Sequence, residues 1–377
     1  MTSSANNSGP SSSSSSSSSS AGATGLAAFD LREGGGVVSS FKNCIAQPGA
    51  ICTIKSCSSF SGLGSSSVEY IAVSDPKKAL INIYTWGKSQ PHKQCHVQEV
   101  ASSICSDMHG AYFFAGSKGG KITAWDLSTG EILRTWTAHY ASVSRVQVTK
   151  CSSLLISTSD EGTVKVWSLP SIVDIYLTED IFASKDVVRA FRSYSPHMMP
   201  VTDMAIMGTH ASMKVVTCSL DKSVVVYDIY ANTTCFKVGF SASMESVVCN
   251  HTEDMIFSGA SNGKIFIVDL TERAIALTTA HSQIATLGVD GETILSASAM
   301  SNGNRKSYMT LEGHTSAVTA LAMSVDNTTL VSTSSDCSIR VWDIITKQCL
   351  RESKPFVKSP LSNVSISIFF TLYSNFN

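Results

Sequence analysis

The sequence predicts an all-β protein built from a repeated antiparallel unit, and two observations lead to this prediction. The first is composition: charged residues make up 15% of the 377 residues, against roughly 25% in an ordinary soluble chain. Serine, threonine and small apolar residues replace them, and this composition favours strands over exposed helices. The second observation is internal repetition, because one pattern of alternating residues recurs along most of the chain.

Three segments carry the repeated pattern most clearly. They are Tyr112–Leu127, Leu154–Leu169 and Leu330–Ile344. Each contains an apolar run, a turn of small residues, a second alternating run, and an aromatic residue followed by Asp or Ser. This order predicts two antiparallel strands joined by a tight polar turn.

The spacing of the repeats predicts the architecture. The terminal residue of each repeat is Trp86, Trp125, Trp167, Tyr227, Val268 or Trp342. Successive positions lie about 40 residues apart, except for two gaps that are longer by about 20 and about 33 residues. A repeat of ~40–45 residues with this ending is typical of the four-stranded blade of a WD-repeat β-propeller. An unrelated β-sandwich would not place the same dipeptide at a fixed interval.

The two ends of the chain are predicted to complete the ring. Residues 1–23 are a low-complexity head containing the serine run Ser11–Ser20, which we expect to be disordered. A phosphorylated tail is the alternative. Residues 24–377 then form the propeller. Gly25–Gly34 and Val37–Phe41 fit the third and outer strands of a seventh blade, and Leu361–Leu372 fits its inner strand. A blade shared between both ends closes the ring.

A recurring polar set is predicted to stabilise the blades. In WD repeats, a His before the inner strand, an acid in the turn before the third strand and a Trp on that strand are hydrogen bonded together. Glu161 occupies the acidic position in one blade, whereas Gly119 and Asn262 replace the acid in two others. Because the set recurs, a structural role fits better than catalysis, which needs one site. The predicted network residues are His139, Trp167, His197, Asp221, Tyr227, His314, Asp336 and Trp342.

We find no pattern typical of catalysis, cofactor binding or metal binding. The segment Gly259–Ile265 resembles a phosphate-binding loop but leads into a strand, so we interpret it as a hairpin turn. The cluster His92–His96 lacks a second ligand pair at zinc spacing, and a short polar strand is the better interpretation. We expect a non-enzymatic protein without cofactors.

Composition also limits the partners and the compartment. The formal charge is −1, which argues against general polyanion binding, although direct RNA contact stays open. Eleven cysteines without a secretory signal predict reduced thiols in an intracellular protein. No apolar stretch reaches the ~18 residues of a membrane span.

Two insertions are candidates for partner binding. The first covers about residues 170–186, where we expect Ser171 to cap a short helix with Ile172, Ile175 and Tyr176 on one apolar face. We predict that these three side chains dock a partner. The second covers about residues 278–304, before the last complete blade. We favour an insertion there over a degenerate blade, and plain surface loops are the alternative for both segments.

Several segments resemble the pre-rRNA-processing WD-repeat family. They are Phe29–Gly34, Ala138–Val143, Val164–Leu169 with its insertion, Pro200–Asp203, Ser219–Val224, Phe257–Ala260 and Asp269–Leu270. The resemblance runs from about Gly25 to Glu352, and the order of the motifs adds to it. The chain departs from the family by lacking its C-terminal extension, and we expect a truncated or mis-spliced end.

The resemblance implies a non-catalytic scaffold in a nuclear, nucleolar or nucleoplasmic complex. That complex acts on the second internal transcribed spacer and on pre-60S particles, with an AAA-type ATPase as a visiting partner. Some members are also linked to DNA replication. The alternative is an unrelated WD-repeat adaptor in ubiquitin ligation or signalling, because the fold alone does not separate the two.

Overall fold

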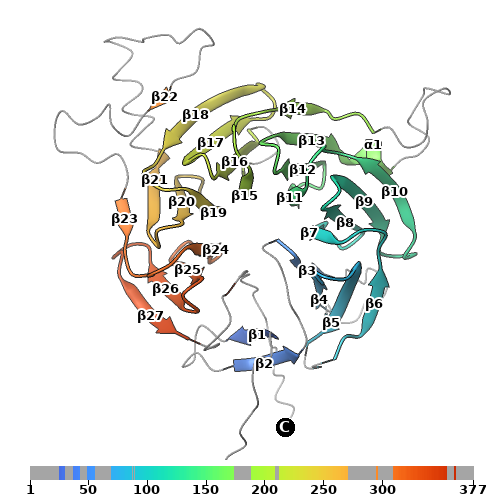
Figure 1. The fold of residues 1–377 in the computed structure, drawn as a ribbon, viewed down its shortest axis with the longest axis horizontal. Coiled ribbons are helices and arrows are strands. Elements are labelled where there is room, and N and C mark those ends of the chain that lie inside the picture. The colour runs from blue at the N-terminus through green and yellow to red at the C-terminus, as the bar shows by residue number, and fades with distance from the viewer. Residues whose placement is uncertain are drawn as a thin grey trace, which may run out of the picture.

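The computed structural model describes residues 25–29, 37–42, 49–55, 69–86, 88, 90–173, 188–208, 212–270, 294–295, 309–354 and 361. These residues form antiparallel sheets arranged as a ring around a central channel (Figure 1). Six of the sheets contain a four-stranded antiparallel meander whose first strand in sequence lies next to the channel (Figure 1). The all-β prediction is confirmed, and the ring of sheets is a β-propeller.

Six sheets of this part of the chain contain at least four strands, and we number them as blades in chain order. Blade 1 is β3 (Ile51–Lys55), β4 (Glu69–Ser74), β5 (Leu80–Thr85) and β6 (Lys93–His96). Blade 2 is β7 (Ala101–Ser106), β8 (Tyr112–Ser117), β9 (Lys121–Asp126) and β10 (Ile132–Thr137). Blade 3 is β11 (Val143–Val148), β12 (Leu154–Ser159), β13 (Val164–Ser168) and β14 (Arg192–Tyr194).

The other three blades repeat the arrangement. Blade 4 is β15 (Val201–Met207), β16 (Lys214–Ser219), β17 (Ser223–Asp228) and β18 (Thr233–Gly239), with β22 (Ile294–Leu295) at its outer edge. Blade 5 is β19 (Met244–Cys249), β20 (Met255–Ala260), β21 (Ile265–Asp269) and β23 (Met309–Leu311). Blade 6 is β24 (Val318–Met323), β25 (Thr329–Ser334), β26 (Ile339–Asp343) and β27 (Cys349–Ser353).

The core lies between neighbouring blades, because the alternating strands place apolar side chains on both faces of every sheet. Between blades 2 and 3, for example, Trp136 packs edge-on against Trp167 with ring centroids 5.7 Å apart. Between blades 4 and 5, Val224, Val226 and Val238 share one cluster with Phe266. Each blade therefore depends on the next one for burial of its apolar surface.

A two-stranded sheet occupies the seventh place in the ring. β1 (Gly25–Phe29) pairs antiparallel with β2 (Val37–Lys42), as the sequence predicted, and the pair lies between blade 6 and blade 1 (Figure 1). Phe41 of β2 contacts Tyr84 of blade 1, with ring centroids 5.4 Å apart. The proposed inner strand 361–372 lies outside the described residues except for Leu361.

Leu361 is placed as the first residue of a further inner strand would be. The Thr319 hydroxyl donates to the Leu361 carbonyl at 2.6 Å. At three other blade junctions, a Ser or Thr at the second or third position of the inner strand donates to the carbonyl of the first residue of the next inner strand. These bonds join Ser102 to Val143 (2.5 Å), Thr202 to Met244 (2.9 Å) and Ser246 to Val318 (3.1 Å). The bond at Leu361 thus continues the pattern beyond blade 6.

Both insertions leave their blades between the third and the outer strand. The first follows β13 and begins with the helix α1 (Leu169–Val173), and β14 then completes blade 3. The expectation that Ser171 caps this helix is wrong, because the helix begins at Leu169. Pro170 instead occupies its first turn, where a missing N–H costs nothing.

The second insertion lies inside blade 5 and does not precede a new blade. β23 pairs with β21 and completes blade 5 after the inserted residues. Within the insertion, β22 pairs in parallel with β18, the outer strand of blade 4. The remaining residues of the expected segment 278–304 are outside the described part of the chain.

Candidate functional site

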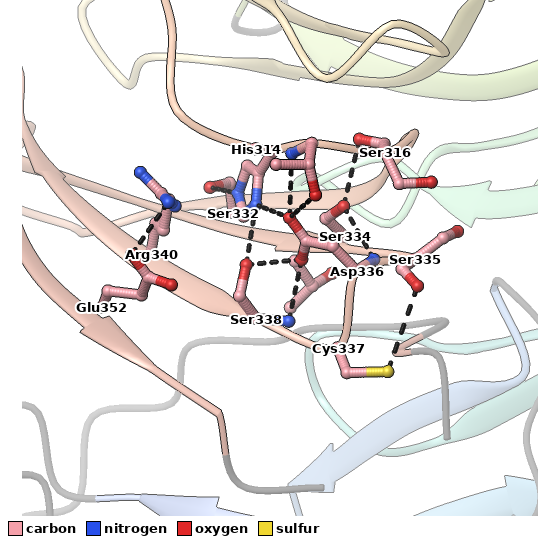
Figure 2. Close-up of polar contacts among 12 residues, drawn as sticks. His314, Ser316, Ser332, Ser334, Ser335, Asp336, Cys337, Ser338, Arg340 and Glu352 are labelled. Carbon is pink, nitrogen blue, oxygen red and sulfur yellow. Dashed lines mark hydrogen bonds and ion pairs between the residues drawn. The ribbon is translucent and has the colours of Figure 1, made fainter. Parts of the chain in front are cut away.

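The polar network of blade 6 joins the loop before β24, strand β25, the turn that follows it and strand β26 (Figure 2). The Trp342 indole N–H donates to the Ser332 hydroxyl at 2.8 Å, and the same hydroxyl lies 2.7 Å from His314 Nε2. On the other side of the imidazole, Nδ1 lies 3.2 Å from Asp336 Oδ2 and 2.9 Å from the Ser338 hydroxyl. The imidazole side chain has no exposed surface. Every polar atom of the ring is therefore satisfied within the blade.

The geometry determines the direction of these hydrogen bonds. The ionised Asp336 can only accept, so Nδ1 carries the imidazole proton; in the neutral ring Nε2 then accepts from the Ser332 hydroxyl, whose oxygen accepts from Trp342. Burial lowers the pKa of His314, which favours this neutral form.

Asp336 is the charged member of the network. Burial acts to raise its pKa, but the Ser338 hydroxyl and the backbone N–H groups of Thr315 and Ser338 outweigh that effect. The pKa of Asp336 is therefore held well below its usual range. The carboxylate is ionised and holds the loop of His314 through the Thr315 N–H at 3.0 Å.

Blade 3 builds the same network with a longer acid. The Trp167 indole N–H donates to Ser157 at 2.9 Å, and Ser157 lies 2.8 Å from His139 Nε2. Glu161 Oε1 lies 2.8 Å from His139 Nδ1. Burial lowers the pKa of His139, so this ring is neutral as well.

Blade 4 forms only the histidine half of the network. His197 Nδ1 lies 3.0 Å from Asp221, and its Nε2 lies 2.9 Å from the Thr217 hydroxyl. The prediction that Tyr227 replaces Trp in this network is wrong. The phenol hydroxyl extends past the strand and donates to Asn232 Oδ1 at 2.6 Å, while its ring stacks on Tyr194 at 3.6 Å.

Blades 2 and 5 have other contacts at the same places. In blade 2, Lys121 forms an ion pair of 2.8 Å with Glu99, which also accepts from Ser117. In blade 5, Phe240 stands four residues before the inner strand, where other blades have His, and packs on Phe266 with centroids 4.9 Å apart. Blades 2 and 5, which have Gly119 and Asn262 at the acidic position, thus also lack the histidine of the network.

Of the three predicted docking residues, the structure describes Ile172. Ile172 is fully buried against Trp167 and its neighbours in the core between blades 2 and 3. A partner cannot reach it in the folded propeller, so the prediction is wrong for Ile172. Ile175 and Tyr176 lie outside the described residues, and for them it stays a prediction. Ile172 is apolar as the helical spacing required, but it covers the protein's own core.

The inner strands surround a channel with a cavity of about 410 Å³. Arg145 Nε donates to Asp203 Oδ1 at 2.7 Å, and Asp203 Oδ2 accepts from the Val247 N–H at 3.1 Å. Asp203 thereby ties blades 3, 4 and 5 together at the channel wall. The sequence offered no signal for this ion pair, because its two members are 58 residues apart.

The described residues contain no group of three or more His, Cys, Asp or Glu side chains placed to hold a metal ion. None of the helical segments in this part of the chain has the length and apolarity to span a bilayer.

The repeats match a known domain family. Residues 130–168 and 305–343 match the WD domain, G-beta repeat, and these ranges contain the Trp167 and Trp342 strands. A computationally designed protein, Ika8, shares 19% sequence identity, with a TM-score of 0.58 over 91% of this chain and 85% of that one. The chain therefore contains WD repeats at these two ranges, and its fold is that of a β-propeller.

Two curated relatives are similar over most of this chain. One is the Pre-rRNA-processing protein IPI3 of Scheffersomyces stipitis, 26% identical over 81% of this chain and 66% of its own length. Another is WD repeat-containing protein 18 of Danio rerio, 29% identical over 79% of this chain and 62% of its own length. The chain thus spans less than two thirds of the length of these relatives.

Proposed function

We propose that this chain is a non-catalytic scaffold in pre-rRNA processing and assembly of the large ribosomal subunit. The observation that carries the proposal is the similarity to a protein named for pre-rRNA processing, which extends over 81% of this chain. The polar groups fit a scaffold, because the His–acid pairs of blades 3, 4 and 6 are buried within their own blades. A rigid ring of this kind positions partners without reacting itself.

The proposed partners are protein subunits of a complex that processes rRNA, the pre-60S particle and an AAA-type ATPase. The proposed location is the nucleus, in the nucleolus or the nucleoplasm, and a further role in DNA replication belongs to the same proposal. The balanced charge of −1 favours protein contacts over a general grip on RNA.

Depletion of the protein from its own cells tests this proposal. We expect large-subunit precursors that retain the second internal spacer to accumulate, while small-subunit precursors mature normally. Northern blots with spacer probes measure both. Re-expression of the wild-type chain is the control and should restore processing. Normal large-subunit precursors after efficient depletion would contradict the proposal and favour an adaptor in ubiquitin ligation or signalling.

A further inference from the structure

Two side chains of this propeller are exposed far more than their chemistry favours. Met198 is 99% exposed and Tyr140 is 95% exposed, and Met199 beside them is 47% exposed. No other large apolar side chain of the described residues exceeds 79%. Single exposed apolar residues are ordinary, whereas several on one surface mark an interaction site.

Both residues occupy the same position in neighbouring blades. Tyr140 directly follows His139, and Met198 directly follows His197, in the loops that enter the inner strands β11 and β15. The equivalent residues of blades 5 and 6 are the polar Ser241 and Thr315. The apolar residues are thus confined to one sector of one face, over blades 3 and 4.

The polar networks hold this surface rigid. Glu161, bound to His139, accepts the Tyr140 N–H at 3.2 Å through its second oxygen. The Met198 loop sits on Gly162, whose φ is +82° and where a Cβ would lie 2.4 Å from the His197 carbonyl oxygen. Only glycine allows that approach. The backbone of these loops therefore loses little conformational entropy on binding, which favours affinity.

The charge at this surface favours a carboxylate. Lys165 Nζ lies 5.8 Å from the centroid of the Tyr140 ring and donates to the Ala138 carbonyl, and Lys237 Nζ donates to the Pro196 carbonyl before Met198. Asp221 is bound by His197 and Ser223, with Lys237 only 4.0 Å away. Lys165 thus has a backbone carbonyl as its partner, whereas Lys237 has a backbone carbonyl and the Asp221 carboxylate.

The acids of the same face are engaged in the loops. Glu161 is bound to His139, and Asp160 is hydrogen bonded with Ser142. Two of the three exposed side chains are methionines, which offer no platform on which bases stack. The insertions of blades 3 and 5 both leave from the opposite face, between third and outer strands.

We propose that Tyr140, Met198 and Met199 form a docking surface for a partner protein that presents an apolar side chain beside a carboxylate. The partner's apolar group covers the methionines and the tyrosine ring. Its carboxylate meets Lys165 or Lys237. This surface does not depend on the proposed role in rRNA processing, because it follows from exposure, rigidity and charge alone.

A selection with a phage-displayed library of random peptides on the purified full chain tests the proposal. The comparison is between wild type and the double variant Tyr140→Ser, Met198→Ser. The matched control is Ile132→Ser, Ile345→Ser, which removes two exposed apolar residues, 52% and 79% exposed, from the opposite face. Equal urea midpoints for the three proteins exclude unfolding as the cause of any difference.

We expect peptides that combine Leu, Phe or Ile with Asp or Glu to be enriched on wild type and on the control. Fluorescence anisotropy with the most enriched peptide should show about a tenfold loss of affinity in the Tyr140, Met198 variant. The same peptide with Asn and Gln in place of Asp and Glu should also bind more weakly. Equal enrichment on all three proteins, enrichment of basic peptides, or displacement of the peptide by an RNA oligonucleotide would each overturn the proposal.

Discussion

Blades 5 and 6 have the same four-stranded meander but stabilise it differently. Blade 6 places His314, Ser332 and Trp342 in one buried hydrogen-bonded network that ends at Asp336. Blade 5 places Phe240 where His would stand and Val268 where Trp would stand, and it packs apolar groups there. The comparison teaches that the polar network is not needed to form a blade. Once present, it makes every member depend on the others, because a buried polar group without its partner is costly.

Removing the tryptophan should give the largest effect. Trp342 is 2% exposed and contacts both the network and the core of blade 6. We expect Trp342→Ala to lower the free energy of unfolding by about 3–5 kcal/mol, because it creates a large cavity and frees Ser332. Urea unfolding measures the change. Val268→Ala in blade 5 is the counterpart, and an equal loss in both variants would contradict the comparison.

Removing the residue at the acidic position should destabilise blade 6 more than blade 5. Asp336→Ala leaves the buried His314 without its acceptor, and we expect a loss of about 1–3 kcal/mol. Asn262 occupies the same turn position in blade 5, where its side-chain oxygen accepts the Lys264 N–H at 3.1 Å and no His stands as its partner. Asn262→Ala should therefore change stability by about 0.5 kcal/mol or less. A comparable loss at both positions in urea melts would show that the turn, and not the network, is responsible.

The sequence predicts the repeat well because the blades are periodic. Trp125, Trp167 and Trp342 end strands at regular intervals, and the same strands appear in the structure. The hydroxyl partners Ser157, Thr217 and Ser332 were not identified, because serine and threonine are common throughout these strands. Their position ten residues before Trp167 and Trp342 is the signal that was available.

Side-chain reach and burial were harder to predict. Tyr227 fits the aromatic position by type, but its hydroxyl reaches Asn232 instead of the network. Ile172 fits an apolar helical face, but periodicity does not show what covers that face. The Arg145–Asp203 pair joins residues that only the closed ring brings together. Local pattern therefore predicted the elements, and contacts between blades decided the site.

Acidification should destabilise blades 3, 4 and 6, which contain the buried His–acid pairs, and should leave the packing of blade 5 unaffected. The pKa values of His139 and His314 are lowered by burial, so the unfolded chain binds protons before the folded one does. Stability is then full above the ordinary His pKa of about 6.5 and is lost as the pH falls below it. Asp336 and Asp221, the latter with its pKa lowered to about 2, add a further loss below about pH 4.

Urea midpoints between pH 7.5 and 5.5 measure the histidine contribution. We expect a decline in wild type that is smaller than the effect of Asp336→Ala, and a shallower decline in His314→Phe, which copies the Phe240 of blade 5. If the variant does not fold, the imidazole titration of wild type by NMR gives the same information. Normal or raised pKa values for both buried rings would contradict the neutral assignment.

The smallest expected effect concerns how each blade is joined to its neighbour. Blade 5 is joined to blade 6 by the Ser246 hydroxyl at the Val318 carbonyl, and blade 6 is joined to the next segment by the Thr319 hydroxyl at the Leu361 carbonyl. Thr319→Val keeps the shape of the side chain but removes the donor, at a cost of about 0.5–1.5 kcal/mol. Ser246→Ala should cost a similar amount of global stability.

Only Thr319→Val should speed proteolysis after Ser353, because its bond holds the segment that would complete a seventh blade with β1 and β2. Limited trypsin digestion followed by mass spectrometry measures this difference. Equal cleavage rates in the two variants would mean that Leu361 does not fasten the end of the ring.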